Sequence, residues 1–287
     1  MADTAVEDSV AIICGGGGFP GAVADAVVRR GHRPVMFALK GWADAKVIEP
    51  YTHYWIAIGQ VGRFLRLARA EHCTSVMFIG TLLRPSLSQI RLDWQTICSM
   101  PRIIQSFRGG DDRLLSGVAS IIEANGLRVI GVGELASEIL VPEGVLGRYQ
   151  PSERDKRDIA RGLALIAAIG PFDVGQAAVV ADNHVVAVEA AEGTDNLIAR
   201  VAELRGTGRV ATPRGVGVLV KAPKPAQDRR FDLPSIGPRT IENAARAGLA
   251  GVAVAANTTM MIDAAEVAAI ADREKMFFAG VTRECGP

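Results

Sequence analysis

The stretch VAIICGGGGFPGAVADAVVRRGHRPVMFALK, residues 10–40, decides the predicted fold. It joins an apolar run at Val10–Cys14, a run of glycines, a helical pattern over Gly21–Arg30 and a second apolar run at Pro34–Leu39. A strand, a tight turn, a helix and another strand in this order form a βαβ unit, whose strands lie parallel in one sheet. The stretch therefore predicts an α/β protein that begins with a parallel sheet.

The same alternation continues on both sides of a proposed linker. Residues 1–137 are predicted to form a Rossmann-like domain with a mostly parallel sheet that helices cover on both faces. Residues 138–152 (EILVPEGVLGRYQPS) contain prolines and glycines without a sustained period, which indicates an interdomain linker. Residues 153–287 are predicted to form a second, mixed α/β domain. It includes a hairpin over Gln176–Ala190 that turns at Asp182-Asn183.

Composition narrows the class of protein. The chain has 287 residues, 49% of them hydrophobic, and a net charge of +1. There is therefore no overall positive electrostatic field that would favour binding of nucleic acid. Its four cysteines lack C-x-x-C spacing and are typical of reduced, structural thiols in a cytoplasmic protein. No segment has the roughly 20 consecutive apolar residues of a spanning helix. We therefore expect a soluble cytoplasmic protein.

The first candidate site is the glycine loop. Gly16, Gly18 and Gly21 satisfy G-x-G-x-x-G between a strand and a helix, where backbone N–H groups of Gly17 and Gly18 can approach a phosphate. The alternatives are a purely structural tight turn and an NAD site. Lys40 disfavours NAD, because it stands where a ribose-binding acid is expected.

Two further candidates lie in the first half. Gly80, Thr81 and Arg84 follow a predicted central strand, at the end of the sheet where ligands bind in open α/β folds. They suit an anionic or sugar ligand, although a loop with a solvated arginine explains them equally. Asp112, in Gly-Asp-Asp before a predicted helix, either holds Mg²⁺ and substrate or simply caps the helix.

Acidic residues flank the predicted hairpin of the second half. Antiparallel pairing brings residues 173–176 close to residues 189–192, beside the start of a helix that Thr194 or Asp195 is expected to cap. Carboxylates, an amide and helical N–H groups at one place suit a hard cation and the phosphates it bridges, although a chance cluster of surface acids is the alternative. The candidates are Asp173, Gly175, Gln176, Glu189, Glu192, Gly193, Thr194 and Asp195.

The most specific segment is KAPKPAQDRRFDLPSIGP, residues 221–238. It follows a predicted buried strand, and its prolines lower the entropy cost of ordering a long loop. Lys221, Lys224 and Arg229 can offset charge on phosphate oxygens, while Asp232 can bind Mg²⁺ or orient water. A solvated charged linker is the alternative. The four histidines are scattered singly, so base chemistry would fall to carboxylates.

Taken in order, these motifs resemble those of the LpxI-type UDP-2,3-diacylglucosamine pyrophosphatases of lipid A biosynthesis. The resemblance covers essentially the whole chain. It is most specific where Glu-Gly-Thr-Asp at residues 192–195 is followed by Lys-Ala-Pro-Lys-Pro and then by Asp-Leu-Pro at residues 232–234.

The resemblance implies Mg²⁺-dependent hydrolysis of UDP-2,3-diacylglucosamine to UMP and 2,3-diacylglucosamine 1-phosphate (lipid X). It also implies two domains with the substrate between them, a homodimer, and a cytoplasmic protein in transient contact with the inner-membrane surface. The essential acid of the family corresponds to Asp232, and at position 228 a carboxylate is required in general. The runner-up function is a non-catalytic sugar-nucleotide binding protein.

The resulting hypothesis assigns a role to each group. Asp232, Asp195 and Lys221 are the expected catalytic residues, and Asp232, Asp173 and Glu189 are the expected Mg²⁺ ligands. The remaining candidates are expected to bind the substrate, with the cations neutralising charge on the phosphoryl oxygens.

Overall fold

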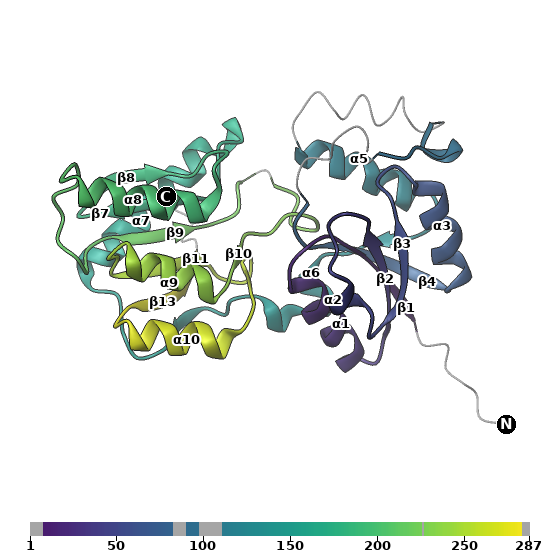
Figure 1. The fold of residues 1–287 in the computed structure, drawn as a ribbon, viewed down its shortest axis with the longest axis horizontal. Helices are drawn as coiled ribbons and strands as arrows, with labels where there is room; N and C mark the ends of the chain where they lie inside the picture. The colour runs from purple at the N-terminus through teal and green to yellow at the C-terminus, as the bar shows by residue number, and fades with distance from the viewer. Residues whose placement is uncertain (1–7, 83–89, 98–110, 226, 283–287) are drawn as a thin grey trace. The chain divides into compact units, whose positions relative to one another are not determined.

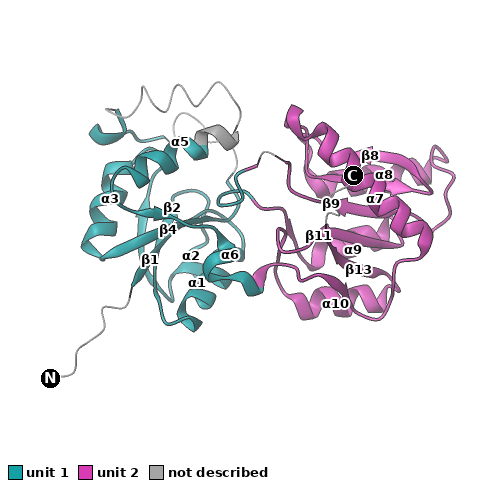
Figure 2. Cartoon of the chain, turned by 180° about the vertical axis from the view of Figure 1, so that it is seen from behind, with its two compact units in different colours: residues 1–138, 228–232 teal, residues 139–227, 233–287 magenta. Residues whose placement is uncertain are grey.

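The computed structural model describes residues 8–82, 90–97, 111–225 and 227–282 (Figure 1). The chain divides into two compact units, shown in teal and magenta in Figure 2. Unit 1 contains residues 1–138 and 228–232, and unit 2 contains residues 139–227 and 233–287. Unit 1 holds a parallel sheet and unit 2 a mixed sheet, which confirms the predicted fold class.

Unit 1 is built on a five-stranded parallel sheet with the order β3-β2-β1-β4-β5. Its strands are β1 (Ser9–Cys14), β2 (Arg33–Leu39), β3 (Thr52–Ile56), β4 (Cys73–Ile79) and β5 (Arg128–Val129). Its helices are α1 (Phe19–Arg29), α2 (Ala45–Ile48), α3 (Val61–Ala70), α5 (Asp111–Glu123) and α6 (Val132–Leu135). The predicted βαβ unit is thus β1, α1 and β2.

The core of unit 1 forms because these strands are apolar on both faces. Phe37 of β2 is fully buried and packs edge-to-face on Phe64 of α3, with ring centroids 4.7 Å apart. Ala119 and Ile122 of α5 join the same cluster. Val23 and Val27 of α1 are also fully buried. Burying one such side chain stabilises the fold by about 2 kcal/mol, so helical cover over the sheet is a main source of stability.

Unit 2 contains a six-stranded mixed sheet with the order β6-β13-β11-β9-β7-β8. Its strands are β6 (Gly144–Leu146), β7 (Ala177–Ala181), β8 (His184–Val188), β9 (Val218–Lys221), β11 (Gly251–Ala255) and β13 (Phe277–Val281). β10 (Ser235–Ile236) and β12 (Met260–Met261) form a separate parallel pair. β9, β11 and β13 are parallel, whereas β7 runs antiparallel to both β8 and β9.

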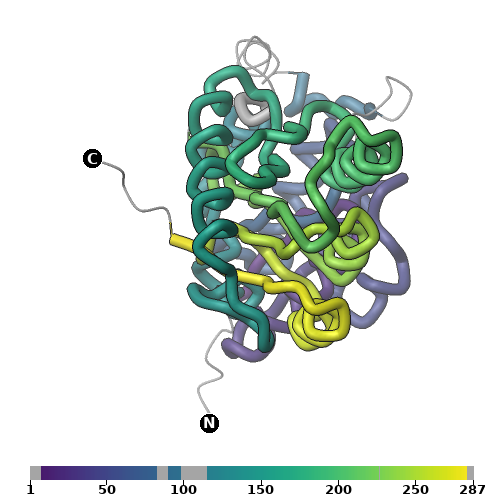
Figure 3. The backbone as a smooth tube through the Cα atoms, turned by 90° about the vertical axis from the view of Figure 1, so that its left-hand side faces the viewer, coloured from purple at the N-terminus to yellow at the C-terminus, as the bar shows by residue number. Residues whose placement is uncertain are grey.

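Helices cover both faces of this sheet. They are α7 (Glu153–Ile169), α8 (Gly193–Gly206), α9 (Pro238–Arg246) and α10 (Ala264–Arg273), with the 3-10 turns η3 (Ser137–Ile139) and η4 (Gly170–Phe172). Figure 3 shows α7 on one side of the sheet and α8 to α10 on the other. The predicted hairpin is present, because Asp182 and Asn183 both have positive φ and link β7 to β8.

Three features differ from the sequence predictions. Residues 138–152 do not behave as a plain linker, because β6 pairs antiparallel with β13 and Val141 is fully buried in the unit 2 core. Residues 228–232 group with unit 1, although 153–287 was predicted as one domain. The expected cap of α8 by Thr194 or Asp195 is wrong: the cap position is Glu192, while Thr194 and Asp195 bond to other side chains.

Two other properties follow from the described residues. Cys14 and Cys73 are buried free thiols, as expected for structural cysteines, and burial raises the pKa of each to about 12. Within the described ranges, no helix has both the length and the apolar character needed to cross a membrane.

Candidate functional site

Two predicted loops of unit 1 meet at the switch point of its sheet. β1 lies between β2 and β4, so the connections that leave β1 and β4 diverge at their carboxyl ends. The backbone amides of Gly16 and Thr81 each donate to the other residue's carbonyl oxygen, at 2.9 Å in both directions. Ligands of open α/β sheets bind at such a switch point, so the structure brings the glycine loop and Gly80-Thr81 to a place suited to binding.

Close packing explains part of the glycine pattern. A Cβ on Gly15 would lie 2.4 Å from the Thr81 carbonyl oxygen, and a Cβ on Gly80 would lie 2.8 Å from the Gly16 carbonyl oxygen. These glycines are required by the loop-to-loop contact. Gly17 differs, since its φ is +90° and nothing lies within 4 Å of a Cβ built there. Gly18 is the N-cap of α1 and makes no side-chain cap. The phosphate-binding interpretation therefore concentrates on Gly17 and Gly18.

Other predictions for unit 1 have different outcomes. Lys40 directly follows β2, which confirms its predicted position at the end of the second strand, and its side chain is exposed. Arg84 lies outside the described residues, and Asp112 belongs to α5, but its side chain lies outside the described part. The roles of Arg84 and Asp112 therefore stay predictions.

Side chains of residues 228–232 anchor this segment within unit 1. The Phe231 ring packs edge-to-face on Phe78 of β4, with centroids 5.4 Å apart, and the Arg230 guanidinium lies 5.1 Å from the Phe231 centroid. Arg230 also bonds to Glu123 of α5 at 2.9 Å. Asp232 is half-buried at the end of this segment and belongs to unit 1. The contacts of Phe231 with β4 and of Arg230 with α5 hold the segment in place.

Asp228 has a clear structural role in the same segment. Its carboxylate accepts hydrogen bonds from Arg230 Nε at 3.1 Å, from Arg230 Nη2 at 2.8 Å and from the Arg230 backbone N–H at 3.0 Å. These hydrogen bonds from Arg230, more than its charge, lower the pKa of Asp228. The carboxylate expected at position 228 thus holds the turn that presents Asp232.

A buried polar relay occupies the carboxyl edge of the unit 2 sheet. Lys221, the last residue of β9, donates from Nζ to Thr194 Oγ1 at 2.9 Å and to the Ser235 carbonyl oxygen at 2.9 Å. Thr194 in turn donates to Glu189 Oε1 at 2.8 Å. Lys221 and Glu189 are each only 8% exposed. A buried cation and a buried carboxylate are thus linked through one hydroxyl, which fixes the position of all three groups.

The start of β7 completes this arrangement. The Gln176 backbone N–H donates to Glu189 Oε2 at 3.0 Å, and a Cβ on Gly175 would lie 2.3 Å from the Glu189 carbonyl oxygen. Only glycine fits at position 175. The predicted approach of the two segments that flank the hairpin is therefore confirmed for Gly175, Gln176 and Glu189.

The first turn of α8 lies beside the relay. Gly193 and Thr194 begin this 14-residue helix, and its cap residue Glu192 makes no side-chain cap hydrogen bond. The N-terminus of a helix carries a partial positive charge and outward N–H groups, which favour an anion. Together with the Lys221 ammonium, this end of the helix can stabilise negative charge on phosphoryl oxygens.

The remaining predicted acids each contact a basic partner. Glu192 bonds to Arg200 at 2.6 Å, Asp195 to Arg239 at 2.6 Å, and Asp173 forms an ion pair with Lys224. Asp195 also accepts from Asn243 at 2.9 Å. Sequence reasoning missed the partners Arg200, Arg239 and Asn243. Arg239 directly follows the basic segment, so its position was the available signal.

The proposed Mg²⁺ ligands do not form a ready-made metal cage. Among the residues that the structure describes, no group of three His, Cys, Asp or Glu side chains lies close enough to hold a metal ion. Glu189 is engaged by Thr194 and Gln176, and Asp173 is engaged by Lys224. The described side chains therefore do not form a preformed metal site.

Comparison with known proteins gives a consistent result for both halves of the chain. Residues 9–139 match the LpxI N-terminal domain, and residues 142–279 match the LpxI C-terminal domain. The chain is also similar to the UDP-2,3-diacylglucosamine pyrophosphatase LpxI of Caulobacter vibrioides. The identity is 38% over 270 residues, which cover 94% of this chain and 96% of that protein.

Proposed function

The chain belongs to the LpxI family, and from this premise we propose that it hydrolyses the pyrophosphate bond of UDP-2,3-diacylglucosamine. The proposed products are UMP and 2,3-diacylglucosamine 1-phosphate. The observation that carries the proposal is the buried relay of Lys221, Thr194 and Glu189 beside the uncapped start of α8. The reaction concentrates negative charge on phosphoryl oxygens, and hydrogen-bond donors that are held in fixed positions stabilise this charge.

The proposed reaction adds one water molecule across the P–O–P bridge. A new P–O bond forms on one phosphorus, the bridging P–O bond breaks, and the second phosphate leaves with the bridging oxygen. The proton lost by the attacking water goes to a carboxylate or to solvent. We assign Asp232 to orienting that water and Lys221 to stabilising charge on the phosphoryl oxygens.

The other candidates bind and position the substrate in this proposal. Gly17 and Gly18 are proposed to offer backbone N–H groups at the switch point of unit 1, where the Gly80-Thr81 loop packs against the glycine loop. Lys224 is only 12% exposed at its side chain and forms an ion pair with Asp173, which orders a cation of the basic segment. Asp195 orders Arg239 in the same way. Arg229 is exposed and is proposed to contact the diphosphate.

Mg²⁺ dependence is part of the proposal. Mg²⁺ keeps several waters and commonly binds through one or two carboxylates together with substrate phosphates, so a preformed cage is not a requirement. Asp232, Asp173 and Glu189 are the proposed protein ligands, and binding the ion would require Glu189 to exchange a hydrogen bond of the relay and Asp173 to exchange its ion pair with Lys224. When bound, the ion would offset charge on the diphosphate.

Two assembly properties are also proposed. We expect a homodimer, to be measured by light scattering on the purified chain, and transient contact with anionic membrane surfaces, to be measured by vesicle sedimentation. Trp94 is 78% exposed and Ile97 is 46% exposed in unit 1, which supports an apolar contact with lipid.

The deciding experiment incubates the pure chain with UDP-2,3-diacylglucosamine and identifies the products by mass spectrometry, with and without EDTA. We expect UMP and 2,3-diacylglucosamine 1-phosphate, loss of both with EDTA, and recovery on adding Mg²⁺. Saturable binding without UMP release would instead favour the non-catalytic sugar-nucleotide binding protein. UMP release that EDTA leaves unchanged would remove only the Mg²⁺ part of the proposal.

A further inference from the structure

Gln227 closes a turn that carries one of the candidate cations. Its side-chain Oε1 accepts a hydrogen bond from the Lys224 backbone N–H at 3.0 Å, and its own backbone N–H donates to the Lys224 carbonyl oxygen at 3.2 Å. Gln227 is only 6% exposed, although glutamine usually lies at the surface of proteins. The two hydrogen bonds join the ends of the turn in both directions, so Gln227 fixes the backbone from which the Lys224 side chain extends.

The same turn packs against η4. A Cβ built on Gly170 would lie 2.5 Å from Pro225 Cδ, so these two residues are already in close contact. The Lys224 ammonium forms an ion pair with Asp173, which directly follows η4. Asp173 is 57% exposed at its side chain, so this ion pair lies near the surface of unit 2, where a ligand can approach it.

The held turn matters because a lysine side chain is long and flexible. A phosphoryl group that binds a mobile lysine must also order its side chain, which costs affinity. In unit 2 the Lys224 side chain is largely buried and the turn that carries it is closed by Gln227, so this ordering takes place before a ligand binds. A cation that is fixed in this way binds an anion more tightly than a mobile one.

Unit 1 contains the same turn without a cation. Gln60 Oε1 accepts from the Ala57 backbone N–H at 3.0 Å, and the Gln60 backbone N–H donates to the Ala57 carbonyl oxygen at 3.2 Å. The first residue of this turn is therefore an alanine where the turn of unit 2 has Lys224. Gln60 makes the same local hydrogen bonds, and it serves as a control for their loss.

We infer that Gln227 is a positioning residue for the diphosphate of the substrate. It holds the turn so that the Lys224 ammonium contacts phosphoryl oxygens, and it does not itself touch the substrate. The inference rests on the proposed function for the identity of the substrate. It assigns to Gln227 a role in binding and none in the chemical step.

Gln227→Met tests the inference, because methionine keeps the length of glutamine but has only a weak acceptor. We expect KM for UDP-2,3-diacylglucosamine to rise about tenfold while kcat changes by less than about threefold. The dissociation constant of α,β-methylene-UDP, a diphosphate that cannot be cleaved between its phosphorus atoms, should also rise about tenfold in calorimetric titration with Mg²⁺. A purely structural role would lower Tm and leave the affinity of the folded protein unchanged.

A double-mutant cycle tests whether Gln227 acts through Lys224. Lys224→Gln removes the charge and should weaken binding of α,β-methylene-UDP about tenfold or more. Adding Gln227→Met to this variant should then change the affinity very little, because the two residues act as one unit. If the two losses are additive instead, Gln227 does not act through Lys224 and the inference is overturned.

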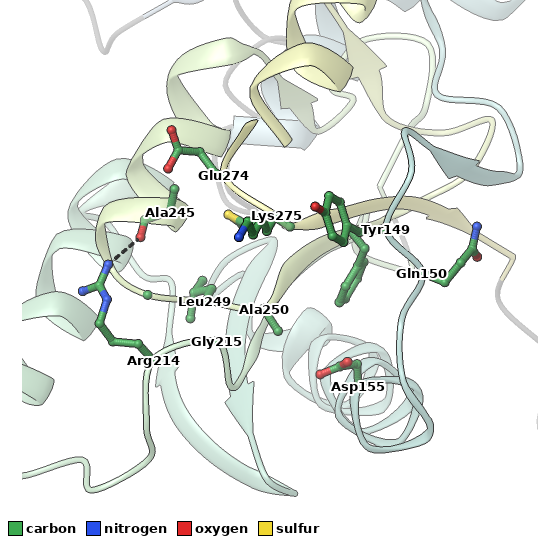
Figure 4. Close-up of a pocket in the computed structure, with 13 residues that line it drawn as sticks. Tyr149, Gln150, Asp155, Arg214, Gly215, Ala245, Leu249, Ala250, Glu274 and Lys275 are labelled. Carbon is green, nitrogen blue, oxygen red and sulfur yellow. Dashed lines mark hydrogen bonds between the residues drawn. The ribbon is translucent and has the colours of Figure 1, made fainter. Parts of the chain in front are cut away.

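Two control variants change groups that are unrelated to Lys224. Gln60→Met removes the equivalent hydrogen bond in unit 1. Arg214→Gln removes a cation at the other edge of the unit 2 sheet, where Figure 4 shows Arg214 donating to the Ala245 carbonyl oxygen beside a hollow of about 380 Å³. Both variants should bind α,β-methylene-UDP with the affinity of the wild type. A tenfold loss in Gln60→Met as well would overturn the inference.

Gly170→Ala keeps the inference testable if Gln227→Met fails to fold. Gly170 has φ −52° and ψ −40°, a conformation that alanine adopts readily, so the new Cβ acts mainly through its contact with Pro225. Displacing Pro225 should displace Lys224 and weaken binding of α,β-methylene-UDP about tenfold. Wild-type affinity in folded Gly170→Ala would contradict the inference.

Binding and turnover are measured separately, so the inference and the proposed function can fail separately. If the wild type binds α,β-methylene-UDP but releases no UMP from UDP-2,3-diacylglucosamine, the hydrolysis fails and the result for Gln227 stands. If the wild type releases UMP while Gln227→Met keeps its KM and its affinity, only the inference fails. A wild type that shows no saturable binding of α,β-methylene-UDP at millimolar concentrations also overturns the inference, because Lys224 then holds no diphosphate.

Discussion

The carboxyl edges of the two sheets differ in the groups that they contain. In unit 1 the edge is mainly backbone, because Gly15, Gly16, Gly80 and Thr81 hold the loops through main-chain contacts. In unit 2 the edge consists of charged side chains, with Lys221 and Glu189 buried around the Thr194 hydroxyl. The comparison shows two ways to bind an anionic ligand in one chain. Unit 1 offers closely packed loops with backbone N–H groups, whereas unit 2 offers a charged side chain held in place by a hydrogen-bond network.

Replacing Asp232 should have the largest effect on activity. Asp232 is a carboxylate that belongs to unit 1, the unit whose sheet edge is otherwise mostly backbone. We expect Asp232→Asn to lower kcat by about a thousandfold or more, which corresponds to about 4 kcal/mol, with substrate binding retained. Asp228→Asn, in the same segment, should lower kcat much less, because it loosens the turn that holds Asp232 but leaves the Asp232 carboxylate in place. Steady-state kinetics and substrate titration of both variants make the test. Near-normal turnover in Asp232→Asn would remove this residue from the mechanism.

Gly80 tests whether the unit 1 edge depends on close main-chain packing. Gly80→Ala should lower the free energy of unfolding by about 2–3 kcal/mol, because φ is +97° and the new Cβ meets the Gly16 carbonyl oxygen. Gly126→Ala is the matched control, since φ is +91° there but nothing lies within 4 Å of the Cβ. Its expected cost is about 1 kcal/mol, from backbone strain alone. Equal losses in urea unfolding would contradict the packing argument.

Thr194 tests the unit 2 network with a smaller change. Thr194→Val keeps the shape but removes the hydroxyl between Lys221 and Glu189, and we expect about a tenfold fall in kcat, or about 1.4 kcal/mol. Thr194→Ser restores the hydroxyl and should recover most of the rate. Both variants are compared by kcat, KM and Tm. If Val and Ser behave alike, the relay has no part in turnover.

Asp228 gives the smallest expected effect and a pH signature. Hydrogen bonds from Arg230 lower the pKa of Asp228, so this carboxylate stabilises the fold above its ordinary pKa of about 4 and loses that contribution as pH falls through the lowered value. The contribution should stay below about 1 kcal/mol, since the pair is partly exposed. The Tm difference between the wild type and Asp228→Asn should shrink between pH 7 and pH 3. A constant difference would exclude this linkage.

Local signals explain how much could be predicted from the sequence. The strands and helices of both units follow from apolar periodicity, and the hairpin at Asp182-Asn183 follows from residues that tolerate positive φ. The approach of Gly175 and Gln176 to Glu189 follows from the antiparallel pairing. In these cases the deciding residues lie close together along the chain.

The features of the structure that the sequence did not predict depend on contacts between residues distant along the chain. Residues 228–232 join unit 1 because Phe231 packs on Phe78 and Arg230 reaches Glu123, and neither partner can be recognised locally. β6 is short and contains a glycine, so residues 144–146 resemble a linker until β13 provides a pairing edge. The relay uses three predicted residues, but their order of donation through Thr194 depends on tertiary positions.

The membership of residues 228–232 in unit 1 has a consequence for biosynthesis. Domains generally fold as units, with the N-terminal one first as the ribosome extends the chain. Here the aromatic ring of Phe231, which packs on Phe78, is translated only after most of unit 2. The nascent N-terminal unit must therefore wait, with the Phe78 surface uncovered, until the polypeptide is nearly finished. A fragment that stops at residue 138 would keep that surface uncovered and should need chaperone protection that the full-length product does not.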